Sequence, residues 1–329
     1  MGKVRFGLIG TSGITENFLK GAAKVKDFEL VGVYSRDLDK AKAFGEKKGA
    51  RLFFDSLEKM ASCEEIDAIY IASPNFMHAS QAITCLEKGK HVLCEKAFAS
   101  NSKEVKKMID AANKNNVVLM EAMKTTVNPN FKALMDNIHK IGKIRRYFAS
   151  YCQYSSRYDK YKVGIVLNAF KKELSNGALM DIGIYCIYPM VVLFGKPENI
   201  KADAIMLESG IDGQGSILFN YKDMNGVIQY SKIANSYVPS EIQGEEGSII
   251  IDKINSPTNI RIKYRDGREE DISVAQEIYD MCYETEEFIN IINSGEKTSK
   301  INSLETSLSV SEIMEEARKQ IGLEFPADL

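Results

Sequence analysis

The chain has 329 residues, a length that indicates two domains of roughly 150 residues each. Its 44% hydrophobic and 27% charged residues are typical of a folded protein and exclude intrinsic disorder. Because 43 Lys and Arg residues nearly balance 45 Asp and Glu residues, the net charge of −2 supplies no strong field. We therefore expect neither nucleic acid nor an anionic membrane as a partner.

The remaining composition indicates a cytoplasmic protein. The N-terminal apolar run is too short for a signal peptide, and no later run reaches the roughly 20 apolar residues of a membrane span. Six cysteines are scattered without a Cys-x-x-Cys pair, and no His-Glu-x-x-His motif is present. We expect reduced thiols, with neither a disulfide framework nor a metal site.

Residues 3–121 alternate short apolar runs with longer amphipathic ones. The short runs predict buried parallel strands at 4–9, 28–34, 68–72, 91–94 and 117–121. The longer runs predict helices at 14–25, 39–48, 76–88 and 103–115. Because strands and helices alternate in this way, we expect a doubly wound Rossmann domain over residues 1–122.

Residues 123–329 predict an α+β domain with an open-faced, mostly antiparallel sheet. Strands are expected at 143–154, 216–221, 226–234, 248–253 and 260–264, with tight turns at Asn225-Gly226 and Asp266-Gly267. Helices are expected at 130–139, 177–194, 277–293 and 304–321. These helices are too few to cover both faces of the sheet, so we expect its free face to join subunits of a homodimer or homotetramer.

The loop after the first strand has the composition of a phosphate-binding turn. Its residues Gly10, Thr11, Ser12, Gly13 and Ile14 lie where backbone amides and a helix dipole bind a dinucleotide pyrophosphate. The loop departs from Gly-x-Gly-x-x-Gly, because Ser12 takes the second glycine position and Gly13 stands one place late. A purely structural turn is the alternative, but the position at the start of an alternating domain favours a dinucleotide.

The residues after the second strand indicate which dinucleotide binds. No acidic residue ends this strand to accept a hydrogen bond from a ribose 2′-hydroxyl, whereas Ser35, Arg36 and Lys40 suit a 2′-phosphate. We therefore expect NADP to be preferred, with NAD possible. The alternative is a solvated loop in which Asp37 or Asp39 caps the next helix.

Two further motifs resemble those of the glucose-fructose oxidoreductase and inositol dehydrogenase (Gfo/Idh/MocA) family. Ser73-Pro74-Asn75-x-x-His78, followed by residues 89–96 with Glu95-Lys96 at their end, resembles the family's nucleotide-domain signature. Residues 176–185, with Asp181 and Tyr185, resemble the helix motif of its substrate domain. The resemblance extends from residue 3 to about residue 325.

The resemblance implies an NAD(P)-dependent oxidoreductase. Its expected reaction is hydride transfer between the nicotinamide and a hydroxyl or carbonyl carbon of a sugar, cyclic polyol or diol. It assigns proton transfer to Lys96, substrate orientation to Asp181 and an acid/base role to Tyr185. It also nominates a set of residues around the nicotinamide, namely Ser73, Pro74, Asn75, His78, Glu95 and Lys96.

The chemistry of the three catalytic candidates agrees with these roles. Asp181 and Tyr185 stand four residues apart, so on a helix their side chains share one face. A lysine beside an oxidised nicotinamide has its ammonium destabilised by desolvation and like charge, which suits Lys96 to take a hydroxyl proton near neutral pH. Because the candidates come from two domains, domain closure over the nicotinamide is expected to bring them together.

Three departures from the family pattern are visible. Ser12 replaces a glycine, Ala97 replaces the proline after Lys96, and Tyr185 replaces a histidine, which indicates the branch resembling dihydrodiol dehydrogenases. A cis bond costs about 3 to 4 kcal/mol before a residue other than proline, against about 0.5 to 1 before proline. We therefore expect the Lys96-Ala97 bond to be trans, or strained if the fold imposes the cis form.

A tyrosine-rich basic loop, with Tyr154, Arg157, Tyr158 and Tyr161, is a candidate for contact with the small-molecule substrate. Arg157 can hold an anionic or polyhydroxyl group, and Tyr158 can stack on a sugar ring. The alternative is a surface loop with packed aromatic residues.

Two other functions remain open from the sequence. One is a non-catalytic dinucleotide-binding sensor, which has no need of Lys96, Asp181 and Tyr185 together. The other is a glycosidase or lyase that keeps NAD(H) bound and oxidises its substrate transiently.

Overall fold

The apolar runs of the first half form one six-stranded parallel sheet in a computed structural model that describes residues 2–329. The strand order is β3-β2-β1-β4-β5-β6, and every pair is parallel. The strands are β1 (Val4–Ile9), β2 (Phe28–Tyr34), β3 (Leu52–Phe54), β4 (Ala68–Ile71), β5 (His91–Glu95) and β6 (Leu119–Ala122). This confirms the Rossmann prediction, with β3 as an additional three-residue edge strand.

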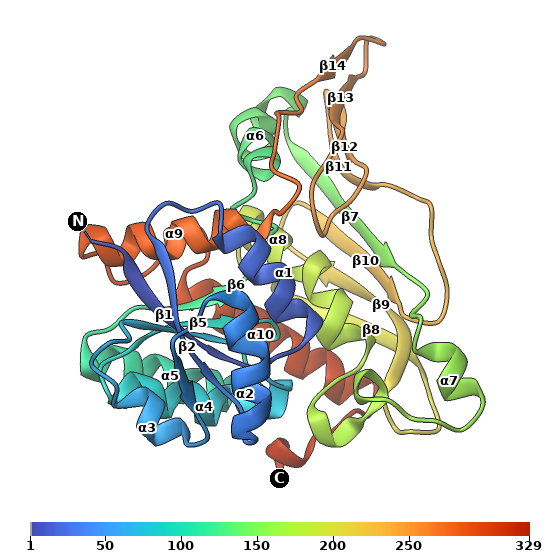
Figure 1. The fold of residues 1–329 in the computed structure, drawn as a ribbon. Helices are drawn as coiled ribbons and strands as arrows, with labels where there is room; N and C mark the ends of the chain where they lie inside the picture. Colours follow the sequence, from blue (N-terminus) through green and yellow to red (C-terminus); the bar gives the residue numbers. More distant parts are fainter. Residues whose placement is uncertain (1) are drawn as a thin grey trace. The chain divides into compact units, whose positions relative to one another are not determined.

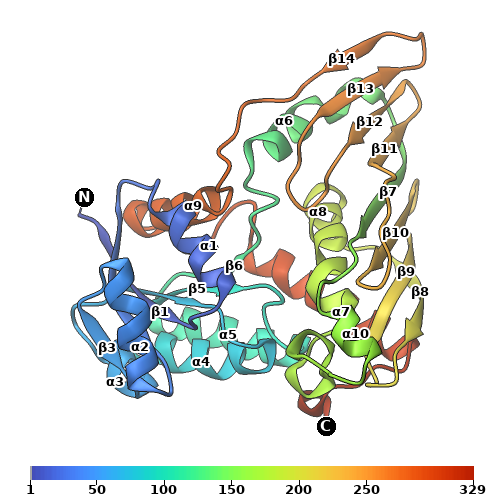
Figure 2. The ribbon, with the colours of Figure 1, turned by 45° about the vertical axis from the view of Figure 1, so that its right-hand side comes forward.

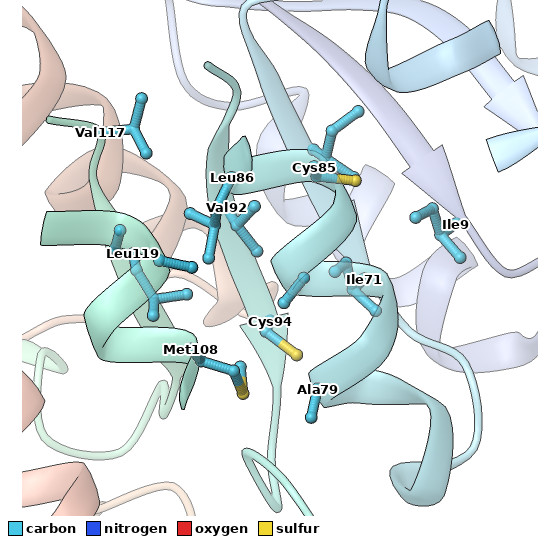
Figure 3. Close-up of a cluster of buried hydrophobic side chains, with 14 of the residues drawn as sticks. Ile9, Ile71, Ala79, Cys85, Leu86, Val92, Cys94, Met108, Val117 and Leu119 are labelled. Atoms are coloured by element: carbon cyan, nitrogen blue, oxygen red, sulfur yellow. The ribbon is translucent and has the colours of Figure 1, made fainter. Parts of the chain in front are cut away.

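Helices cover both faces of this sheet, as the apolar strands require. On one face α3, α4 and α5 enclose a core that includes Ile71, Leu86 and Met108 (Figure 3). On the other face α1, α2 and α9 enclose a core that includes Phe6, Phe18 and Phe288. The bounds are α1 (Gly13–Ala22), α2 (Leu38–Gly45), α3 (Leu57–Ala61), α4 (Asn75–Glu87), α5 (Ser102–Asn115) and α9 (Met281–Ser294).

The chain divides into two units, and the division is not contiguous (Figure 1). The first unit contains residues up to Lys124 together with Glu277–Leu308, and the second contains Thr125–Gln276 together with Ser309–Leu329. The sequence pattern predicts one division after residue 122, which would place Glu277–Leu308 in the second domain. The reason for the difference is that α9 packs closely against α1 of the first unit. The two backbones approach so closely that a Cβ added to Gly21 of α1 would lie 2.7 Å from the backbone nitrogen of Cys282 in α9.

The register of the parallel strands aligns four loops along one edge of the sheet. Ile9 of β1 pairs with Tyr34 of β2 on one side and Ile71 of β4 on the other, and Ile71 pairs with Cys94 of β5. The loops after these four strands therefore leave the sheet at its carboxyl edge. In open α/β sheets this edge, at the point where the strand order reverses, is where ligands bind.

The second unit contains an eight-stranded sheet of order β14-β13-β12-β11-β7-β10-β9-β8, in which only the β7 and β10 pair is parallel. This confirms the mostly antiparallel prediction. Its strands are β7 (Ile144–Cys152), β8 (Asn199–Met206), β9 (Asp212–Asn220), β10 (Asn225–Ser231), β11 (Ser240–Gly244), β12 (Gly247–Ile251), β13 (Ile260–Tyr264) and β14 (Glu269–Asp271). The helices are α6 (Pro129–Asn137), α7 (Tyr158–Lys162), α8 (Ile184–Phe194) and α10 (Leu304–Gln320), which begins in the first unit.

The two faces of this sheet differ in burial. On one face α8 covers the sheet (Figure 2). Tyr147 and Ile228 are buried on this face, and the Tyr147 hydroxyl donates a 2.9 Å hydrogen bond to the Cys186 carbonyl of α8. On the other face Phe148, Val227 and Leu218 are neighbours in register across three strands. Leu218 is 53% exposed there, so this face is open in the described chain.

One stretch, residues 172–194, is long and apolar enough to span a bilayer by length and composition. It includes α8, and 72% of its most apolar window is buried inside the structure. This burial is the property of a core helix.

A buried carboxyl group in β6 has a measurable consequence for stability. Glu121 is 1% exposed, and its Oε1 accepts a 3.0 Å hydrogen bond from the Phe98 amide. Its Oε2 has no hydrogen-bond partner among the described residues. Burial raises the pKa of Glu121 from 4.5 to about 8, so the folded chain holds a proton there that the unfolded chain releases at lower pH.

We therefore expect the free energy of unfolding to fall as the pH rises from about 5 to about 8.5, by a few kcal/mol from this group. Glu121→Gln keeps an acceptor for the Phe98 amide but carries no charge, so its loss of stability over that interval should be smaller. Urea unfolding of both proteins at pH 5.5 and pH 9 measures the difference. The exposed Glu87→Gln serves as control, and an identical pH dependence in wild type and Glu121→Gln would contradict the expectation.

Candidate active site

The loop after β1 has the geometry of a phosphate cradle. Gly10 adopts a φ of +105°, and a Cβ added there would lie 2.6 Å from the Ala72 carbonyl oxygen, so only glycine fits. Ser12 precedes α1 in extended conformation without capping the helix through its side chain. A Cβ added at Gly13 would meet no atom within 4 Å, so the start of α1 is open. The loop therefore fits a pyrophosphate on the helix amides.

The loop after β2 combines a helix cap with exposed cations. Asp37 Oδ1 accepts hydrogen bonds from the amides of Asp39 at 3.1 Å and Lys40 at 3.2 Å, so Asp37 does cap α2. These hydrogen bonds, with the Lys40 amide first, lower the pKa of Asp37. Lys40 Nζ lies 3.5 Å from Asp37 Oδ2, whereas Arg36 is exposed beside Ser35. Of the predicted cations, Arg36 is thus the one that does not neutralise Asp37.

His78 of α4 connects the loops after β4 and β5. One ring nitrogen lies 2.8 Å from the Ser73 carbonyl oxygen, and the other lies 2.9 Å from the Ala97 carbonyl oxygen. The ring is completely buried, and this burial lowers the pKa of His78. His78 therefore supports the Pro74-Asn75 turn and the Lys96 loop from inside the first unit.

Lys96 lies at the carboxyl edge of the sheet, directly after β5, and is half-buried. The Lys96-Ala97 peptide bond is cis, whereas the first expectation for this bond was trans. The titratable groups that interact with Lys96 include the carboxyl groups of Glu95 and Glu121 and the imidazole of His78.

Two buried acidic groups lie close to each other beside Lys96: Glu95, which precedes it in the chain, and Glu284, which faces Glu95. Glu95 is 6% exposed and accepts a 2.6 Å hydrogen bond from the Tyr70 hydroxyl, and burial raises the pKa of Glu95. Glu284 of α9 faces Glu95, is completely buried, and has no hydrogen-bond partner among the described residues for either carboxyl oxygen. Burial raises the pKa of Glu284 well above its usual range. No local motif signals Glu284, because it comes from a helix far along the chain.

The second unit holds Asp181 and Tyr185 at the start of its core helix. The helix predicted at 177–194 begins with a π-turn over Leu179–Gly183, a local widening that is frequent at functional sites. Asp212 caps this turn: its Oδ2 accepts a 2.6 Å hydrogen bond from the Leu179 amide, and burial raises the pKa of Asp212 to about 6. The Tyr185 ring packs edge-on against Tyr151 at a centroid distance of 5.8 Å.

Asp181 is paired with a lysine that sequence reasoning did not select. Its Oδ2 accepts a 2.6 Å hydrogen bond from Lys232 Nζ, while 39% of the Asp181 side chain remains exposed. Lys232 comes from the end of β10, and no sequence motif links it to the Asp181 helix. The sequence signals it only as a charged residue within the predicted strand 226–234.

The tyrosine-rich loop lies in the same region of the second unit. Tyr158 of α7 contacts the rings of Tyr154, Tyr161 and Phe170 at centroid distances of 5.6 to 5.8 Å. The Phe170 ring in turn lies 5.3 Å from Lys232 Nζ. The structure therefore connects Tyr158 to the Asp181-Lys232 pair through Phe170, with Arg157 exposed at the start of α7.

Comparison with known proteins gives consistent matches over the chain. Residues 4–123 match the oxidoreductase family with an NAD-binding Rossmann fold, and residues 132–250 match the GFO/IDH/MocA C-terminal domain. The chain is 54% identical over 325 residues to scyllo-inositol 2-dehydrogenase (NADP(+)) of Bacillus subtilis (strain 168), with 99% of each chain covered. It is 31% identical over 339 residues to trans-1,2-dihydrobenzene-1,2-diol dehydrogenase of Xenopus laevis, with 98% of this chain and 99% of the relative covered.

Solved structures agree on the fold. A 3-ketoreductase of Actinomadura kijaniata, in complex with NADP and TDP-benzene, has a TM-score of 0.84 at 21% identity, with 97% of this chain and 98% of that chain covered. A levoglucosan dehydrogenase in complex with NADH and levoglucosan has a TM-score of 0.83 at 22% identity over the same shares. The two family matches and the full-length relatives confirm the resemblance drawn from the two sequence motifs: the chain belongs to the Gfo/Idh/MocA family of oxidoreductases.

Proposed function

We propose that this protein is an NADP-preferring dehydrogenase that interconverts a secondary hydroxyl and a carbonyl on a cyclic polyol. The observation that carries the proposal is the 54% identity, over 99% of both chains, to a scyllo-inositol 2-dehydrogenase (NADP(+)). The diol dehydrogenase relatives support the same reaction class on a ring bearing neighbouring hydroxyls. An inositol-type substrate is therefore the first to test.

The first unit would hold the cofactor along the carboxyl edge of its sheet. Gly10 to Ile14 would bind the pyrophosphate, and Ser35, Arg36 and Lys40 would bind the 2′-phosphate. The Ser73 to Asn75 turn and the Glu95-Lys96 loop, held together by His78, would frame the nicotinamide. When bound, the nicotinamide supplies the hydride acceptor or donor.

In the proposed reaction, Lys96, Asp181 and Tyr185 have different roles. Lys96 takes the proton of the substrate hydroxyl during oxidation and returns it during reduction. Asp181 accepts a hydrogen bond from a substrate hydroxyl and orients the ring, while Tyr185 donates to or relays from the reacting oxygen. Lys96 belongs to the first unit, whereas Asp181 and Tyr185 belong to the second.

We propose that Arg157, directly before α7, and Tyr158, the first residue of α7, also contact the substrate. Arg157 is an exposed cation, and Tyr158 presents part of an aromatic cluster, so both suit a polyhydroxylated ring.

We also propose a cytoplasmic location. The six cysteines, which are free thiols in the structure, support it.

Lys96→Ala should lower kcat by roughly 10²- to 10⁴-fold, because the hydroxyl proton then lacks its acceptor. The Kd for NADPH should change little. Steady-state oxidation of scyllo-inositol and myo-inositol with NADP⁺, followed by reduced-nicotinamide absorbance, measures kcat, and fluorescence titration measures the Kd. Lys88→Ala, an exposed lysine at the end of α4, is the matched control.

Near-normal kcat and unchanged pH dependence in Lys96→Ala would remove this lysine from the mechanism. Wild-type protein that binds NADPH but oxidises no polyol would favour the sensor. Conversion of a glycoside without net change in nicotinamide absorbance would favour transient oxidation by a glycosidase or lyase.

Arg36→Ala should weaken NADPH binding roughly tenfold or more, the contribution of one charge-assisted contact of about 1.5 to 3 kcal/mol. NADH binding should hardly change, because NADH lacks the 2′-phosphate. Titration of both cofactors with the variant and with Lys47→Ala, an exposed lysine beyond the other end of α2, gives the comparison. Tighter NADH than NADPH binding by the wild type would refute the cofactor preference.

We further propose that the open face of the eight-stranded sheet forms the interface of a homodimer or homotetramer. The apolar row Leu218, Val227 and Phe148 supports this, because an exposed apolar stripe on a sheet favours burial against a partner. Leu218→Glu should shift the assembly towards monomer in multi-angle light scattering, whereas Val163→Glu, an exposed apolar residue outside the sheet, should not. A monomeric wild type at micromolar concentration would overturn the proposal.

A further inference from the structure

Lys232 is a buried cation outside the family motifs. It directly follows β10 and is only 4% exposed. Its amide donates a 2.9 Å hydrogen bond to the Gly213 carbonyl, and its carbonyl accepts a 2.9 Å hydrogen bond from the Ser155 amide. The backbone is thus held on two sides, and the side chain passes inward to Asp181.

The Lys232 ammonium lies in a buried environment that contains two carboxyl groups. Its Nζ lies 2.6 Å from Asp181 Oδ2 and 5.3 Å from the centroid of the Phe170 ring. The carboxyl group of Asp212, completely buried at the start of β9, also faces it, and Asp212 Oδ1 has no hydrogen-bond partner among the described residues. The buried hydroxyl of Tyr230 in β10 faces Asp212 in turn.

A buried ammonium is unfavourable unless a carboxylate is paired with it. Here the pairing is asymmetric, because the lysine is buried while 39% of the Asp181 side chain is exposed. A surface ion pair between two mobile side chains contributes little, but a rigid buried partner fixes the direction of the exposed carboxylate. It also favours the ionised form of that carboxylate.

We propose that Lys232 is a positioning residue for substrate binding: it holds Asp181 ionised and oriented towards the hydroxyl that Asp181 binds. This inference rests on the proposed function, because the orienting role of Asp181 belongs to it. The Phe170 ring, which packs against Tyr158 and Tyr161, lies over the ammonium and contributes to its burial. Lys232 itself touches neither substrate nor cofactor in this scheme.

Lys232→Met removes the charge and keeps the apolar stem. We expect kcat/KM for the polyol to fall roughly 10- to 100-fold, chiefly through a higher KM, as for the loss of a charge-assisted hydrogen bond. The acidic limb of the kcat/KM profile should move to higher pH, because Asp181 then lacks its cation. Lys222→Met, an exposed lysine in the turn before β10, should change neither quantity.

Lys232→Arg keeps the charge and tests the electrostatic part separately. It should restore the acidic limb of the wild type, even if KM stays raised because the larger head group shifts Asp181. NADPH affinity should stay unchanged in every variant, because the proposed cofactor site lies in the other unit. A Lys232→Met enzyme with wild-type KM and wild-type acidic limb would overturn the inference.

A stability cycle tests the pairing without any activity measurement. Asp181→Asn leaves the buried ammonium without its carboxylate and should lower the melting temperature, and adding Lys232→Met to that variant should recover most of the loss. Additive losses in the double variant would overturn the pairing. If instead the cycle shows coupling while the wild type oxidises no polyol, the proposed function fails and the pairing stands.

Discussion

The common register of β1, β2, β4 and β5 is the constraint on which the cofactor half of the candidate site depends. Because Ile9, Tyr34, Ile71 and Cys94 are paired across the sheet, the four following loops start at the same level. The first loop then lies so close to the carbonyl of Ala72 that Gly10 can have no side chain. Buried apolar strands hold this register, since a one-residue shift would move every side chain of the strand into the wrong one of the two packed cores.

Each unit places buried titratable groups next to its half-buried catalytic candidate. In the first unit, Lys96 faces Glu95 and Glu121, carboxyl groups whose pKa values are raised by burial. In the second unit, Asp181 is paired with a buried lysine. Electrostatic interactions are stronger in such a low-dielectric interior than in water. The buried groups therefore interact more strongly with Lys96 and Asp181 than solvent-exposed groups at the same distance would.

Much of the fold and half of the candidate site follow from local patterns. The strands of the first sheet are short apolar runs, and the glycine loop and the Lys96 motif each occupy a few consecutive residues. Four strands escaped prediction, β3, β8, β11 and β14, and three of these are only three to five residues long. The π-turn at Asp181 also escaped, because helical periodicity predicts the regular α-helix rather than its local widening.

The sequence by itself determined the family, the two-domain architecture and the identity of Lys96, Asp181 and Tyr185 as candidates, because these reside in contiguous motifs. Only the tertiary structure decided which buried charged groups lie next to these motifs. Glu284 of α9 faces Glu95, which lies 189 residues earlier in the chain. Lys232, directly after β10, pairs with Asp181, which lies 51 residues earlier. No local pattern encodes such pairs, because the free energy that fixes them arises from packing between elements distant in the chain.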